Sequence, residues 1–163
     1  MKLKITPCLW FDQQAEQAAR FYTSIFPDSR IVHTTHYGEA GHEIHGKPAG
    51  SVLTVVFELA GQPFTALNGG PLFKFSEAVS LQVFCDTQAE IDHYWQRLGE
   101  GGDPAAQQCG WLKDQFGLSW QIVPAQLSEM FACGDRAKTE RLMAALLGMH
   151  KLDIARLQQA YQG

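Results

Sequence analysis

The chain repeats part of itself, because Asp12 recurs as Asp86, 74 residues later. Residues 9–16 read LWFDQQAE and residues 83–90 read VFCDTQAE, so a Gln-Ala-Glu triplet follows both aspartates. A period this long exceeds that of solenoid repeats, which is about 20–50 residues. In a chain of 163 residues, close to one average domain, it predicts a duplicated module inside a single domain.

The same order of elements begins both copies. Two kinds of side chain alternate over residues 4–11 and again over residues 79–85, which is typical of a strand with two unlike faces. Apolar residues at helical spacing follow each run, and they predict helices over about residues 13–26 and 88–98.

Capping signals support the two helix starts. Asp12 and Asp86 each lie where a predicted strand ends, so each can cap the helix that follows. In the second copy, Thr87 and Glu90 have the spacing of a capping box. Both signals indicate that a strand passes directly into a helix in each module.

Three further strand-like runs follow each predicted helix. They cover residues 30–37, 51–59 and 63–67 in the first half, and residues 105–109, 111–113 and 118–123 in the second half. Gly61-Gln62 and Gln115-Phe116-Gly117 are typical of hairpin turns. Each half therefore reads strand, helix and three strands.

The organisation that follows is one paired-module domain over residues 1–124, with module one at 1–71 and module two at 72–124. Residues 125–163 form a C-terminal helical extension of the same domain, since Leu127, Leu142 and Leu157 each belong to an apolar group at helical spacing. These groups predict a short helix, a longer one and a last one.

The segment 38–50 contains four glycines in thirteen positions and is the predicted mobile loop. His42 and His45, with Glu39 and Glu43, could chelate a metal there. The alternative is a solvated loop, because no helix is predicted in this segment to hold such ligands in place. We favour the solvated loop.

Composition excludes several classes of function. Acidic residues outnumber basic ones by 17 to 13, which argues against a nucleic-acid-binding protein. No apolar run is long enough to cross a bilayer, and the first residues do not have the pattern of a secretion signal. The four cysteines are widely spaced and form no CxxC pair. We therefore expect a reduced, cytoplasmic protein with no nucleic-acid or membrane partner.

Several short motifs together resemble a known family. They are PCLWF (7–11), FY (21–22) with FPDS (26–29), LNGGP (67–71) with FKF (73–75), CGW (109–111), DQFG (114–117), SWQIVP (119–124) and MHKLDI (149–154). With the two modules, they resemble the vicinal oxygen chelate superfamily, which includes glyoxalase I, bleomycin resistance proteins and extradiol dioxygenases. The closest resemblance is to its PhnB-like branch, often labelled 3-demethylubiquinone-9 3-methyltransferase.

This resemblance implies an α+β fold in which two tandem βαβββ modules form a curled mixed-sheet cup, with C-terminal helices added. In the superfamily the cup holds one ligand, often with a divalent metal bound by the first and last strands of each module. The corresponding residues here are Thr6, Asn68, Ser80 and Gln121. Two amides and two hydroxyls carry no charge to offset a divalent cation. We therefore expect neither a metal nor another cofactor.

The expected ligand-binding set is larger than these four residues. It consists of Thr6, Cys8, Trp10, Asn68, Phe75, Ser80, Gln82, Phe84, Cys109, Trp111 and Gln121. For several of them a structural role is also open: the amides could satisfy strand-end backbone groups, the cysteines could be small buried residues, and the aromatics could be core. Trp111 could line the cup mouth or a dimer interface.

The sequence thus predicts a PhnB-like protein that binds a small molecule in a metal-free cup, with its specific function unknown. The alternative is an enzyme, by methyl transfer as the label says or by metal-assisted lyase, isomerase or dioxygenase chemistry. Against methyl transfer, Pro71 follows the Gly-rich run 68–70, so no helix opens there to hold a donor nucleotide. We also expect a homodimer, because the apolar residues of the C-terminal helices need cover that a partner chain could supply. The alternative is that the tail folds back over its own modules.

Overall fold

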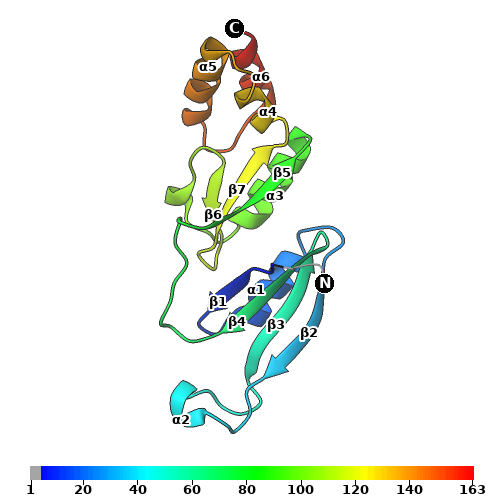
Figure 1. Ribbon diagram of the computed structural model, residues 1–163, viewed down its shortest axis with the longest axis vertical. Helices are drawn as coiled ribbons and strands as arrows, with labels where there is room; N and C mark the ends of the chain where they lie inside the picture. The colour runs from blue at the N-terminus through cyan, green and yellow to red at the C-terminus, as the bar shows by residue number, and fades with distance from the viewer. Residues whose placement is uncertain (1–4) are drawn as a thin grey trace. The chain divides into compact units, whose positions relative to one another are not determined.

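The computed structural model describes residues 5–163, and the chain divides into two compact units, Met1–Lys74 and Phe75–Gly163 (Figure 1). Each unit has its own mixed sheet with helices packed on it, which confirms the predicted α+β class. Within residues 5–163 no helix is both long enough and apolar enough to cross a bilayer.

The first unit follows the predicted order of strand, helix and three strands. Its strands are β1 (Cys8–Phe11), β2 (Arg30–His36), β3 (Val52–Leu59) and β4 (Gln62–Asn68), and its helices are α1 (Ala15–Thr23) and α2 (His42–His45). The sheet order is β1-β4-β3-β2, with β1 parallel to β4 and the other pairs antiparallel. The β3–β4 turn centres on Ala60 and Gly61, both with positive φ, one residue earlier than predicted.

One face of this sheet is buried under α1. The helix contributes a stripe of three alanines and Tyr22, all fully buried. Opposite them, the Phe57 and Phe64 rings stack at 5.4 Å and Tyr22 lies over Phe57 at 6.3 Å. Small residues on the helix let these rings approach closely, which explains why an alanine-rich segment packs well here.

The second unit has one strand fewer than predicted. Its elements are β5 (Ser80–Cys85), α3 (Gln88–Gly99), the 3-10 turn η1 (Pro104–Ala106), β6 (Trp111–Lys113) and β7 (Ser119–Pro124). The sheet order is β5-β7-β6, with β5 parallel to β7. The strand predicted at 105–109 is wrong: Asp103 accepts the Ala105 N–H and starts η1, and only the isolated bridge Gln108↔Trp111 remains.

Most other local signals in this unit are confirmed, although the N-cap of α3 is Thr87 and not Asp86. The capping box of Thr87 and Glu90 begins α3. Trp120 is 2% exposed, and its indole N–H donates to Asp114 Oδ2 at 2.8 Å. The other carboxylate oxygen of Asp114 accepts the Phe116 and Leu118 N–H groups, so one buried carboxylate shapes the predicted β6–β7 turn.

The tail forms the three predicted helices, α4 (Leu127–Phe131), α5 (Arg136–Leu147) and α6 (Ile154–Gln162). Many of their apolar residues pack within their own unit, around a buried cluster of Val123, Leu142, Met149, Leu152 and Leu157. The alternative that the tail folds back over its own unit therefore holds for these side chains, whereas Met143 is 44% exposed and Leu147 is 58% exposed. The homodimer itself stays a prediction.

A short stretch between α5 and α6, residues 148–153, holds the tail against the rest of the unit; we call it the docking segment. The Cys109 N–H donates to Met149 O at 2.8 Å, and the Gly110 N–H donates to His150 O at 2.7 Å. Gln88 bonds both Leu152 O and the Ile154 N–H. The segment therefore adds backbone hydrogen bonds to the loop that precedes β6.

Candidate functional site

The first sheet has an open face on the side away from α1. Cys8 and Trp10 of β1 pair with Thr65 and Leu67 of β4, and side chains at paired positions share a face. Cys8 is exposed, while Trp10, Thr65 and Leu67 are half-buried. Thr6 is exposed and precedes β1. Sequence reasoning missed Thr65 and Leu67, which the strand register brings beside the predicted residues.

Trp10 is held in one orientation. Its indole N–H donates to Gly70 O at 2.8 Å, and its ring meets Phe73 edge-on at 4.9 Å between centroids. A Cβ on Gly69 would lie 2.2 Å from the indole, so only glycine fits beneath the ring. The Gly-rich run after β4 is therefore explained by packing against Trp10, and not by the approach of a phosphate.

Asn68 does not share the open face with Cys8 and Trp10. It pairs with buried Phe11 and is itself 7% exposed, on the side of α1. Its Oδ1 accepts the Ala15 N–H at 2.8 Å, and its Nδ2 donates to Val52 O at 3.0 Å. Asn68 therefore caps α1, the role predicted for Asp12. The role left open for this amide in the sequence, satisfying backbone groups at a strand end, is confirmed.

The second sheet also has an open face, and it carries a chain of polar side chains. Gln121 of β7 lies in the centre, next to Gln82 of β5 and Trp111 of β6. The Gln121 Nε2 donates to Ser80 Oγ at 2.8 Å, and the Gln82 Nε2 is 3.3 Å from Gln121 Oε1. We call Ser80, Gln121 and Gln82 the amide chain. The structure thus brings three predicted residues into one hydrogen-bonded row.

Other predicted residues lie around this row. Phe84, next but one after Gln82 on β5, is 57% exposed, and Phe75 is half-buried. Val123, next but one after Gln121 on β7, is buried in the tail cluster, so the tail covers one end of this face. Ser119 is 1% exposed, and its hydroxyl has no hydrogen-bond partner among the described residues.

The cysteines differ in environment. Burial raises the pKa of the Cys85 thiol to about 11, and Cys85 is part of the core. Cys109 lies in the loop before β6 with φ +53 and receives a contact from Gln108 Nε2 at 3.3 Å. Cys133, which sequence reasoning did not weigh, is exposed, and a hydrogen bond with Tyr161 lowers the pKa of its thiol.

The superfamily's metal does not fit the residues present. Ser80 and Gln121 already bond each other, Asn68 lies on the other face of its sheet, and all the predicted donors are neutral. The described residues 5–163 contain no group of three or more His, Cys, Asp or Glu side chains placed to hold an ion. His42 and His45 do lie on a helix, α2, which the sequence did not predict.

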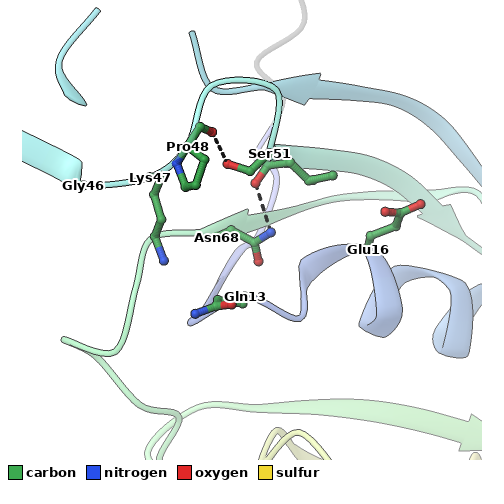
Figure 2. Close-up of a pocket in the computed structure, with 8 residues that line it drawn as sticks. Gln13, Glu16, Gly46, Lys47, Pro48, Ser51 and Asn68 are labelled. Atoms are coloured by element: carbon green, nitrogen blue, oxygen red, sulfur yellow. Dashed lines mark hydrogen bonds between the residues drawn. The ribbon is translucent and has the colours of Figure 1, made fainter. Parts of the chain in front are cut away.

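A separate polar pocket lies in the first unit, where β4 ends and α1 begins (Figure 2). Its volume is about 550 Å³. The lining includes Gln13, Glu16, Lys47, Ser51, Val52 and Asn68. Sequence reasoning missed Lys47 because it lies in the Gly-rich segment that was expected to be solvated.

The βαβββ unit and the open sheet faces define a protein of the vicinal oxygen chelate class, also called the glyoxalase class. A family model described as 3-demethylubiquinone-9 3-methyltransferase matches residues 3–123. The chain belongs to this PhnB-like family. Residues 124–163, with the tail motif at 149–154, lie outside the matched stretch.

Solved structures support the same assignment. A Bacillus cereus PhnB protein, whose description carries the same methyltransferase name, is 36% identical, with a TM-score of 0.62 over 74% of this chain and 99% of its own. A Pseudomonas aeruginosa protein (19% identity, TM-score 0.58, 76% and 98% covered) shares the fold. So does the fosfomycin resistance protein FosX of Mesorhizobium loti (18%, 0.54, 81% and 98%). No curated protein matches the chain.

Proposed function

We propose that this chain binds a small organic molecule on the open faces of its sheets, without a metal. The observation that carries the proposal is the amide chain on the second sheet. Its central residue, Gln121, is only half-buried, and Gln82 is exposed. A row of amides on an uncovered sheet face provides oriented donors and acceptors, which is how polar groups in small-molecule sites fix a ligand.

The chemistry of these residues suggests the kind of ligand. Each carboxamide can donate two hydrogen bonds and accept two, so Gln82 keeps capacity after its contact with Gln121. Aromatic surface lies next to the amide chain: Trp111 pairs with Gln121, and Phe84 is next but one after Gln82 on β5. We propose a neutral molecule that combines a carbonyl or hydroxyl group with a flat apolar part.

Methyl transfer, which the family description names, has less support. A donor nucleotide would need a Gly-rich turn that opens a helix. Here Gly69 accommodates the Trp10 ring, and α1 is capped by Asn68. The test below therefore includes S-adenosylmethionine as a competing ligand.

The experiment is a ligand-detected NMR screen of small oxygenated aromatics and of S-adenosylmethionine, run on the full chain with and without a chelator. For a hit, Gln121→Leu should weaken binding by about tenfold or more, since it removes the central amide and leaves Ser80 unpaired. The matched control is Gln158→Leu, an exposed glutamine on α6. Gln82→Leu serves as a second variant at an exposed site.

Three outcomes would overturn the proposal. One is binding that the chelator abolishes, together with one equivalent of nickel, zinc or iron in the purified protein. Another is a hit whose affinity is the same in Gln121→Leu, Gln82→Leu and the control. A third is tight binding of S-adenosylmethionine, which would restore methyl transfer as the function.

A further inference from the structure

The polar pocket of the first unit is distinct from the open face of its sheet. Asn68, which lines the pocket, has its side chain on the α1 side of β4, whereas Cys8 and Trp10 lie on the other side. Figure 2 shows Lys47 and Glu16 at opposite sides of the pocket, with Asn68 and Gln13 between them. The proposed function uses none of the charged groups here.

Lys47 has an incompletely paired ammonium group. Its side chain is only 18% exposed, yet its nearest acceptors among residues 5–163 are Asp12 O at 3.4 Å and Asp12 Oδ1 at 3.7 Å. A charge-assisted hydrogen bond of this kind is normally about 2.7–2.9 Å long, and an ammonium group has three hydrogens to donate. The largely buried Lys47 ammonium group can therefore donate further hydrogen bonds to a ligand in the pocket that it lines.

The backbone around Lys47 is fixed by a short series of contacts. The Lys47 N–H donates to His45 Nδ1 at 2.9 Å. The His45 ring packs on the Tyr37 ring at 4.5 Å, and the Tyr37 hydroxyl donates to Asn68 O at 2.6 Å. Since these contacts already place the lysine, binding to it requires little ordering of the chain.

The remaining lining limits the charge of the ligand. The Glu16 carboxylate of the lining is paired with Arg20 at 2.6 Å, and Asp12 already lies near Lys47, so one partly offset positive charge remains for a ligand and a second negative charge would be repelled. Gln13 and Ser51 supply neutral polar groups, and Val52 supplies apolar surface. The pocket therefore suits a single negative charge on a short, partly apolar molecule better than it suits a phosphate dianion.

We propose that this pocket binds a small monocarboxylate, with the Lys47 ammonium group donating to the carboxylate. The site is additional to ligand binding on the open sheet faces. Each can exist without the other, because no residue of the amide chain lines this pocket.

The test is a titration of the ¹⁵N-labelled full chain with sodium propionate, followed by NMR, at constant ionic strength maintained with chloride. We expect saturable shifts of the amide signals of Gln13, Lys47 and Ser51. Lys47→Gln should weaken binding by about tenfold or more, because a charge-assisted hydrogen bond is lost. Lys74→Gln, at an exposed lysine of the same unit, should bind as the parent does.

The proposal fails if propionate causes no saturable shift, or if Lys47→Gln and Lys47→Met both keep the parent affinity. Lys47→Met retains most of the apolar stem, so it separates loss of charge from loss of packing. Inorganic phosphate binding more tightly than propionate would overturn the ligand class. Shifts confined to Gln82 and Gln121 would place propionate on the open face and would also overturn this site.

Discussion

Substituting Gly110 by alanine should destabilise the second unit, because this glycine lies where the docking segment meets the sheet. A Cβ at this position would lie 3.0 Å from Ile122 O on β7 and 3.0 Å from Leu152 Cδ1. The backbone there also has φ +84, a conformation that residues other than glycine adopt only at a cost in free energy. The Gly110 N–H and C=O both take part in backbone hydrogen bonds, so the loop cannot move away without breaking them.

The expected loss of stability in Gly110→Ala has two contributions, backbone strain and overpacking. A positive φ costs an alanine about 1–2 kcal/mol, and overpacking against a fixed backbone costs about 1–3 kcal/mol more. We therefore expect Gly110→Ala to lower the free energy of unfolding by about 2–5 kcal/mol. Gly117 is the matched control: its φ is +85, but a Cβ there would meet no heavy atom within 4 Å. Gly117→Ala should cost about 1–2 kcal/mol.

Urea unfolding followed by tryptophan fluorescence measures both variants. In a double-mutant cycle, Leu152→Ala should remove part of the Gly110→Ala penalty, because it removes one of the two close neighbours. Equal destabilisation by Gly110→Ala and Gly117→Ala would refute the close packing. A coupling energy of zero with Leu152 would refute the contact with the docking segment.

Three further predictions concern single groups. Asn68→Ala should lower the free energy of unfolding by about 1–3 kcal/mol, because it removes the cap of α1 and leaves buried backbone groups unpaired, and Asn68→Asp, which keeps an acceptor, should cost less in the same urea assay. Cys133 should react with a disulfide reagent at lower pH than an ordinary thiol does, since its pKa is lowered, whereas Cys85, with a pKa of about 11, should react only after unfolding; mass spectrometry of labelled peptides measures the order. The hydrogen bond from Lys151 lowers the pKa of Asp92, so its contribution to stability is present above the ordinary carboxyl pKa and is lost as the pH falls through the lowered value; Lys151→Met should destabilise at neutral pH and have no effect in strong acid, by thermal unfolding.

The strand and helix pattern was predictable because it rests on local periodicity, but the face on which a residue lies at a strand end was not. The family resemblance implies that Asn68 lies in the cup with Thr6, but its side chain lies on the α1 side of the sheet. Successive residues of a strand point to opposite faces, so an error of one residue in register exchanges the faces. The pairing of Phe11 with Asn68 is a long-range fact that neither local segment contains.

The missing strand at 105–109 has a different cause. Its residues, AAQQC, contain no alternation that distinguishes a strand from a turn. The decisive signal is Asp103 followed by Pro104, which together start a 3-10 turn. This capping pattern was readable in the sequence, and it outweighs the expectation that the second module copies the first.

The cover of the tail residues could not be predicted from the sequence. An apolar stripe shows that a helix is buried on one side, but it does not show whether its own chain or a second copy buries it. Here the docking segment holds part of the tail within its own unit, through Met149 and Leu152 in the core cluster and backbone hydrogen bonds from Cys109 and Gly110.

The docking segment also has a consequence for the order in which the protein folds during synthesis. The first unit has all its strands once Asn68 has been made, so it can fold while the rest of the chain is still being translated. The second unit cannot, because Leu152 and Leu157, which close its cluster beside Val123, are made well after its last strand, which ends at Pro124. Until then Val123 stays exposed on the nascent chain, and this is the stage at which we expect chaperones to bind and aggregation to begin.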